Sequence, residues 1–163
     1  MALAGIGVDI VDIARMERVL KRTPSFARRV FTDEERAYCE STNRPAAHYA
    51  CRFAAREAVL KALGCGFGEG VRFDDVSVAQ DGTGRPRAQL KGRAAEVAAR
   101  QGVLDVAISL SFTREMAVAN AVATTSETAP KASEARDPRR ELAESFRAAR
   151  SVIDELERVQ DRK

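Results

Sequence analysis

The stretch Gly5-Ile6-Gly7-Val8-Asp9-Ile10-Val11 has the pattern of an apolar strand with an acid near its middle. In an extended chain the side chains alternate, so one face carries Ile6, Val8 and Ile10 and the other carries Gly7, Asp9 and Val11. An unpaired carboxylate in such a segment is costly, so Asp9 is expected to meet a cation, a metal ion or a hydrogen-bond network. The two glycines leave space for a close neighbour. The alternative is that Asp9 lies at a strand end and caps the next element.

The composition favours a soluble, cytoplasmic domain of ordinary size. The 163 residues are 45% hydrophobic and carry a net charge of only +3 from 27 basic and 24 acidic side chains, with no Trp, which argues against a general nucleic-acid binder. Cys39, Cys51 and Cys65 include no close pair, which favours a reducing compartment. The single histidine, His48, leaves little material for a histidine metal site. No signal peptide or bilayer-spanning apolar stretch is expected.

Periodicity and capping signals predict an α+β fold over residues 1–123. We expect strands at 3–11, 71–79, 85–90, 105–111 and 116–123, and helices at 12–22, 33–40, 46–63 and 93–101, with a short apolar segment at 25–31. Asp12 is a candidate N-cap, and Thr32 with Glu35 has the spacing of a capping box. The mostly antiparallel sheet is expected to pack on the long helix at 46–63.

The chain changes character after residue 123. Residues 124–138 are polar and contain two prolines, which is typical of a linker. Residues 139–163 have the pattern of a charged amphipathic helix. Its apolar stripe suits packing on its own body, or docking on another subunit or partner.

The long helix carries a second group of charged residues. Glu57 and Lys61 are four apart and therefore share one helix face, where a solvated ion pair is the plain interpretation. Together with Asp9, however, Glu57 completes a pair of carboxylates of the kind that binds Mg²⁺ beside a phosphate. Lys61, Arg52 and the glycine-rich loop 64–70 suit a polyanionic phosphate substrate.

Four ordered motifs resemble those of the holo-acyl-carrier-protein synthases, the small bacterial 4′-phosphopantetheinyl transferases. They are Gly5-Ile6-Gly7-Val8-Asp9-Ile10, Phe31-Thr32-x-x-Glu35, Arg52-Phe53-Ala54-Ala55-Arg56-Glu57-Ala58-x-x-Lys61-Ala62-Leu63-Gly64 and Ile108-Ser109-Leu110-Ser111. The resemblance spans about residues 4–123. It implies transfer of the phosphopantetheine arm of coenzyme A to a serine of an apo acyl carrier protein, with release of adenosine 3′,5′-bisphosphate.

The resemblance also implies roles for individual residues. Asp9 and Glu57 would hold Mg²⁺, Glu57 could accept a proton, and Lys61 would stabilise phosphate charge. The implied coenzyme-binding residues are Arg44, Arg52, Gly64 and Gly66. Arg15 would meet the acidic carrier protein, as its basic helix also suggests, although that face could simply be solvated. Related proteins form trimers with sites between subunits, so a homotrimer is implied.

One position departs from the family pattern. Phe112 stands where the family normally has a histidine, and a phenyl ring can neither donate a hydrogen bond nor carry charge. The chain could compensate, act slowly, or be a catalytically impaired relative that serves as a carrier-protein-binding or assembly subunit. His48 is the only other imidazole, although a lone helix histidine is usually structural or exposed. The sequence leaves open which carrier is served, in fatty acid biosynthesis or secondary metabolism, and whether acyl-coenzyme A is accepted.

Overall fold

The computed structural model describes residues 5–67, 70–129, 145–147 and 150. The chain divides into two compact units, residues 1–129 and 130–163. The first contains, in chain order, β1 (Gly5–Asp12), α1 (Ile13–Arg22), α2 (Ser25–Val30), α3 (Asp33–Glu40), α4 (Pro45–Ala62), the 3₁₀ turn η1 (Phe73–Asp75), β2 (Val76–Gln80), β3 (Pro86–Leu90), α5 (Gly92–Arg100), β4 (Val103–Phe112) and β5 (Met116–Thr125). Most of the helix expected at 139–163, and most of the expected linker, lie outside the described residues.

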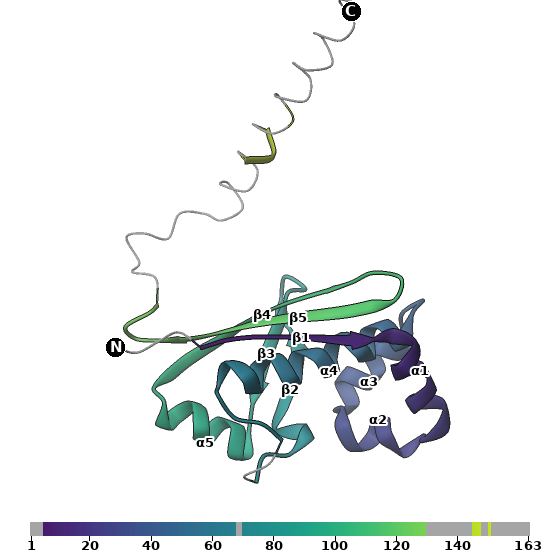
Figure 1. The fold of residues 1–163 in the computed structure, drawn as a ribbon, viewed down its shortest axis with the longest axis horizontal. Coiled ribbons are helices and arrows are strands. Elements are labelled where there is room, and N and C mark those ends of the chain that lie inside the picture. Colours follow the sequence, from purple (N-terminus) through teal and green to yellow (C-terminus); the bar gives the residue numbers. More distant parts are fainter. Residues whose placement is uncertain (1–4, 68–69, 130–144, 148–149, 151–163) are drawn as a thin grey trace, which may run out of the picture. The chain divides into compact units, whose positions relative to one another are not determined.

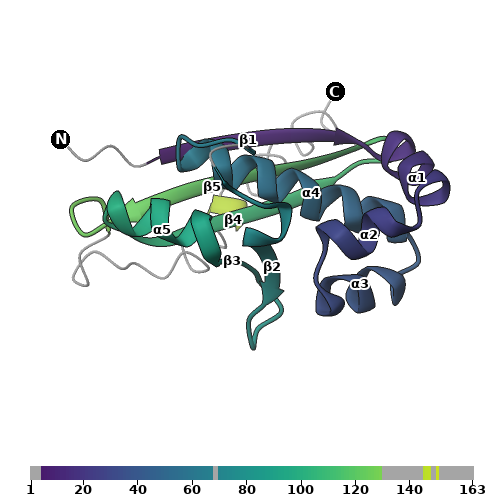
Figure 2. The same ribbon diagram turned by 90° about the horizontal axis from the view of Figure 1, so that it is seen from below.

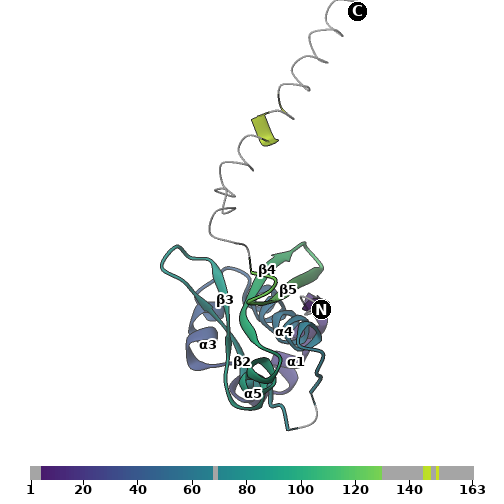
Figure 3. The same ribbon diagram turned by 90° about the vertical axis from the view of Figure 1, so that its left-hand side faces the viewer.

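The strands form two antiparallel sheets, which confirms the predicted α+β class. The larger sheet has the order β1-β5-β4, and β2 pairs only with β3. Figures 1 and 2 show α4 running along the larger sheet, with α1, α2 and α3 gathered at one end and α5 at the other. The end view in Figure 3 shows the β2–β3 hairpin projecting beside α3 and α5. In the described part of the chain, no helix combines the length and the apolar character needed to cross a bilayer.

The contact between β1 and α4 depends on two glycines. A Cβ atom at Gly5 would lie 1.8 Å from the carbonyl oxygen of Ala62, and one at Gly7 would lie 1.8 Å from that of Ala58. Only hydrogen fits in the space that separates strand and helix, so no other residue type is compatible with this spacing. The close neighbour expected beside these glycines is therefore the long helix.

The outer face of β1 is apolar and exposed. Ile6 is 71% exposed, Val8 46% and Ile10 58%, while Gly7 is buried and Asp9 half-buried on the side of α4. The alternation follows the predicted pattern. The larger aliphatic side chains, however, point away from the body's own core, because the glycine face is the one that the helix covers.

A buried ion pair ties α3 to α4 and the smaller sheet. The guanidinium of Arg56 donates to both carboxylate oxygens of Glu35, at 3.0 and 2.6 Å, and both side chains are fully buried. The amide of Val78 donates to Glu35 at 2.9 Å, and Arg56 also donates to the carbonyl of Phe73 at 3.0 Å. Removing only one of these two side chains would leave the other charge buried without its partner, which strongly destabilises a folded protein.

Local signals located most elements correctly. Asp12 caps α1 by accepting from the amide of Arg15 at 2.6 Å, and Thr32 and Glu35 form the predicted capping box of α3. The expected strand at 71–79 begins only at Val76, because Phe73–Asp75 is a 3₁₀ turn. Asp75 accepts from the amides of Arg72 and Arg93, which holds this turn in place of an extended strand. β5 continues to Thr125, two residues beyond the expected end.

We predict that Gly7→Val strongly destabilises the protein. The added side chain would collide with the backbone of α4 at Ala58, which cannot move aside as a flexible side chain could. The expected loss is about 3 kcal/mol or more of unfolding free energy, as for overpacked cores. Urea unfolding followed by circular dichroism measures it.

The matched control is Gly82→Ala, where a Cβ atom meets no heavy atom within 4 Å. Equal midpoints for Gly7→Val and the wild type would show that β1 and α4 are not held at this distance.

Candidate active site

The acid in β1 has a cation as its partner. The Nζ atom of Lys61 lies 2.8 Å from Oδ1 of Asp9 and 3.0 Å from the carbonyl oxygen of Val8. The Asp9 side chain is 17% exposed and that of Lys61 is 51% exposed, so the pair lies at the surface end of a partly enclosed site. The hydrogen bond to Asp9 is the main cause that raises the pKa of Lys61, which therefore stays charged at neutral pH.

Glu57 lies one turn before Lys61 on α4 and is close enough to Asp9 to feel its charge. Burial is the main cause that raises the pKa of Glu57; repulsion by Asp9 adds to the shift and Lys61 opposes it. Asp9, Glu57 and Arg15 line one hollow of about 660 Å³. The two acids that are distant in sequence therefore converge beside one lysine.

The carboxylate pair fits a divalent cation that keeps other ligands. Within residues 5–67 and 70–129, no group of three or more His, Cys, Asp and Glu side chains is placed to hold a metal by itself. Mg²⁺ commonly takes one or two carboxylates and completes its octahedron with water and substrate phosphate. Asp9 and Glu57, with a hollow beside them, are a donor set of that kind.

Two phenylalanines form an apolar wall of the same hollow. Phe53 lies four residues before Glu57 on α4, and its ring centroid is 6.2 Å from that of Phe26 in α2. Phe26 belongs to the short apolar segment predicted at 25–31, and no role was predicted for Phe53. The spacing of four residues between Phe53 and Glu57 could have predicted that Phe53 borders the site, because it places both side chains on one helix face.

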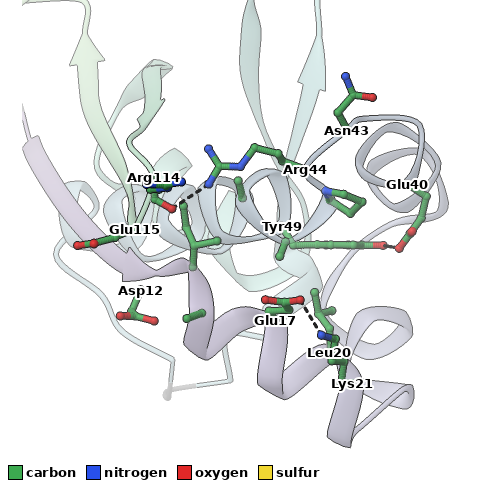
Figure 4. Close-up of a pocket in the computed structure, with 15 residues that line it drawn as sticks. Asp12, Glu17, Leu20, Lys21, Glu40, Asn43, Arg44, Tyr49, Arg114 and Glu115 are labelled. Atoms are coloured by element: carbon green, nitrogen blue, oxygen red, sulfur yellow. Dashed lines mark hydrogen bonds and ion pairs between the residues drawn. The ribbon is translucent and has the colours of Figure 1, made fainter.

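Arg44 lies immediately before α4 and reaches the turn between β4 and β5. It donates to the carbonyls of Thr113 at 3.3 Å and Arg114 at 2.8 Å, and its guanidinium lies 5.2 Å from the ring centroid of Phe112. Figure 4 shows Arg44 at the edge of a second hollow, of about 810 Å³, with Asp12 and Glu17 of the α1 region across from it. The two hollows lie on different faces of α1 and share Asp12.

Arg52 is a buried cation that forms no ion pair with a carboxylate among the described residues. It is 4% exposed, and its guanidinium lies over the ring of Tyr38 at 4.1 Å. One of its amino groups donates to the carbonyl of His48 at 3.5 Å, and its Nε atom has no hydrogen-bond partner among the described residues. The described residues therefore leave the charge of this guanidinium unbalanced, which is unusual for a buried arginine.

The remaining residues predicted for the site are Arg15, Gly64 and Gly66. Arg15 is exposed on α1 and lines the hollow of Asp9 and Glu57. Gly64 follows the end of α4 with φ of 65°, and a Cβ atom at Gly64 or Gly66 would meet no heavy atom of the described residues within 4 Å. Both glycines therefore leave their surroundings accessible, one turn beyond Lys61. The structure brings Asp9, Glu57, Lys61 and Arg15 together and places Arg44 and Arg52 in a separate group.

Comparisons with known proteins place this site in a family context. Residues 5–124 match the 4′-phosphopantetheinyl transferase superfamily. A holo-[acyl-carrier-protein] synthase of Syntrophus aciditrophicus is 45% identical over 114 residues, which are 69% of this chain and 89% of the relative. The crystal structure of the holo-[acyl-carrier-protein] synthase of Neisseria meningitidis has a TM-score of 0.67 at 34% identity, covering 74% of this chain and 98% of that one.

A second solved structure contains a ligand. The holo-(acyl-carrier-protein) synthase of Bacillus anthracis, in complex with CoA (3′,5′-ADP), has a TM-score of 0.61 at 34% identity and covers 75% of this chain and 96% of that one. The matches end near residue 124, so the tail lies outside the shared region.

Proposed function

This chain belongs to the holo-[acyl-carrier-protein] synthases of the 4′-phosphopantetheinyl transferase superfamily, and we propose that it moves the 4′-phosphopantetheine group of coenzyme A to a serine of apo acyl carrier protein. We propose further that the reaction depends on Mg²⁺ and releases adenosine 3′,5′-bisphosphate. The observation that carries the proposal is the convergence of Asp9 and Glu57 in one hollow beside Lys61.

The residues of this hollow suit phosphoryl transfer. The serine hydroxyl oxygen would form a bond to the phosphorus that bears pantetheine, while the bond from that phosphorus to the bridging oxygen of the diphosphate breaks. Glu57 is the proposed acceptor of the serine proton, because burial and Asp9 raise its pKa and make it a stronger base. Lys61 would stabilise charge on the phosphate oxygens. Mg²⁺, held by Asp9 and Glu57, would supply neutralisation of the diphosphate charge when bound.

Other residues are proposed to hold the two substrates. Arg44 and Arg52 would bind nucleotide phosphates, which is supported by their having no carboxylate ion pair among the described residues. Gly64 and Gly66 would line the coenzyme loop, where both leave open space. Arg15, with exposed Arg18 and Arg22 on α1, would attract an acidic carrier protein.

We also propose that the chain assembles as a homotrimer with sites between subunits. The exposed apolar row Ile6, Val8 and Ile10 supports this, since a contiguous apolar face on a soluble protein usually marks an interface. In this proposal residues 1–123 are the transferase domain, 124–138 a linker and 139–163 a helical tail. Cys39 and Cys51, which are buried free thiols, support a reducing, cytoplasmic setting.

A catalytically impaired relative that binds or assembles carrier proteins is the second candidate. Phe112 favours it, because the position offers no polar group to a coenzyme phosphate.

We expect Asp9→Asn and Glu57→Gln to lower the rate of carrier modification by roughly a hundredfold or more, the usual effect of removing a group that stabilises transition-state charge. Mass spectrometry of apo carrier protein incubated with coenzyme A and Mg²⁺ measures the gain of the phosphopantetheine mass.

Asp105→Asn is the matched control, because among the described residues the carboxylate of this exposed acid has one ion-pair contact, at 4.0 Å from Arg87. Near-normal rates in either site variant would contradict the metal pair. Carrier binding by the wild type without a mass gain would favour the second candidate.

We expect Arg15→Glu to raise KM for the carrier protein by about tenfold with a smaller change in kcat, because it reverses charge on the docking helix. Steady-state rates at low and high salt measure the effect, which added salt should reduce. Arg100→Glu makes the same charge change at an exposed position of α5 and should leave KM unchanged. An equal rise in both variants would show that overall charge, and not the α1 surface, attracts the carrier.

We expect the wild type to sediment as a species of three 17.8 kDa chains and Ile6→Asp to shift this equilibrium toward smaller species. A charge placed on an apolar interface must be desolvated when the chains associate. Gln80→Asp adds the same charge to the smaller sheet as a control. Analytical ultracentrifugation that shows a monomeric wild type at micromolar concentration would contradict the trimer.

A further inference from the structure

The lysine of the site contacts the same carboxylate that is proposed to bind the metal ion. Its Nζ atom, in Lys61, lies 2.8 Å from Oδ1 of Asp9 and 3.0 Å from the carbonyl oxygen of Val8. Because only 17% of the Asp9 side chain is exposed, few approaches to its carboxylate are open to a cation, and the ammonium group takes one of them. Lys61 is therefore placed to compete with any second cation at Asp9.

The backbones hold the lysine and the acid together, while the lysine side chain itself keeps its freedom. A Cβ atom at Gly7 would lie 1.8 Å from the carbonyl oxygen of Ala58, so β1 and α4 are in direct backbone contact within one helical turn of Lys61. The Lys61 side chain is nonetheless 51% exposed. Its ammonium group can therefore turn from Asp9 toward another acceptor without any movement of the strand or the helix.

The charges around the hollow do not suffice for a divalent ion. Its lining includes the carboxylates of Asp9, Asp12 and Glu57 and the guanidinium of Arg15, and Lys61 adds a second positive charge at Asp9. With all of these groups ionised, the site carries one net negative charge, which is half of what a divalent ion needs. Asp12 is also engaged as the N-cap of α1, where it accepts from the amide of Arg15 at 2.6 Å.

We propose that Lys61 makes metal binding depend on coenzyme A. Its positive charge keeps a divalent ion weakly bound at Asp9 and Glu57 until the diphosphate of the coenzyme supplies the missing negative charge. This inference rests on the proposed function, because it takes Asp9 and Glu57 as the metal ligands.

The exposed lysine side chain provides the physical link between the two ligands. Diphosphate oxygens give the ammonium group of Lys61 an alternative to Asp9, and the carboxylate that it leaves becomes available to the ion. Each ligand then strengthens the binding of the other, and by thermodynamic linkage the two factors are equal. The ion and the coenzyme would therefore enter the site together.

Binding of Mn²⁺ to the chain alone tests the competition without catalysis. Mn²⁺ takes the same oxygen ligands as Mg²⁺, and the electron paramagnetic resonance signal of the free ion measures how much is bound. We expect Lys61→Met and Lys61→Gln to bind Mn²⁺ about tenfold more tightly than the wild type, because each removes a unit charge a few ångströms from the ion. Lys61→Arg keeps the charge and should bind as weakly as the wild type.

Lys91→Met is the matched control. It removes another exposed lysine from an ion pair with an aspartate, 3.2 Å from Asp74, and should leave the affinity for Mn²⁺ unchanged. An equal gain in Lys91→Met and Lys61→Met would overturn the inference, because it would assign the effect to overall charge.

The same titration with coenzyme A present, and without carrier protein, measures the coupling. We expect coenzyme A to raise the affinity of the wild type for Mn²⁺ by roughly a hundredfold and that of Lys61→Met by only about tenfold. Without the coenzyme, an affinity of Lys61→Met and Lys61→Gln that is equal to or lower than that of the wild type would overturn the inference. A lower affinity would assign Lys61 the role of holding Asp9 in position.

The carrier-modification assay separates this inference from the proposed function. If Lys61→Met binds Mn²⁺ more tightly but the wild type modifies no carrier protein, the transfer proposal fails and the competition at Asp9 stands. If the wild type transfers phosphopantetheine and both chains bind Mn²⁺ equally, the inference alone fails. A wild type that transfers the group but binds no Mn²⁺, with or without coenzyme A, would overturn the metal pair and the inference with it.

Discussion

The site depends on how closely α4 approaches β1. Glycines at positions 5 and 7 let the carbonyl oxygens of Ala62 and Ala58 occupy space that any side chain would fill. The same approach puts Lys61 within 2.8 Å of Asp9 across 52 residues of sequence and brings Glu57 within its electrostatic reach. A side chain at either position would push the strand away from the helix, which would disturb the core and separate the two acids. The close packing of these two backbones therefore determines which side chains meet at the site.

Two buried arginines in α4 have different surroundings, although they lie one turn apart in the same helix. Arg56 is paired with Glu35 and bonded to the carbonyl of Phe73, so it joins α3, α4 and the smaller sheet. Arg52, one turn earlier, contacts a tyrosine ring and a backbone carbonyl. The fold satisfies the first within the chain. For the second the described residues supply burial and a ring contact but no carboxylate, which is why Arg52 and not Arg56 is the proposed phosphate-binding residue.

Elements with strong local signals were predictable, and contacts between distant segments were not. The cap at Asp12, the capping box at Thr32 and the long alanine-rich helical pattern at 46–63 each depend on neighbours in sequence. The 3₁₀ turn at Phe73–Asp75 was missed because its stabilising acceptor, Asp75, also bonds Arg93 across 18 residues. For the partner of Asp9 the sequence predicted a cation, a metal ion or a hydrogen-bond network, and only the fold identifies Lys61. The family resemblance is confirmed by the comparisons, whereas the role of each site residue stays a prediction.

The alternation along β1 has a consequence for how the strand must pair. Odd positions carry the glycines and the acid that face α4, and even positions carry the aliphatic side chains that face outward. A slip of one residue against β5 would exchange the two sets, forcing Ile6 and Val8 into the helix and turning the acid to the opposite side. A chain with this shifted register would therefore fail to pack against the helix, and it would lose both the acid site and the outer apolar face. No register shifted by one residue keeps any of these three features.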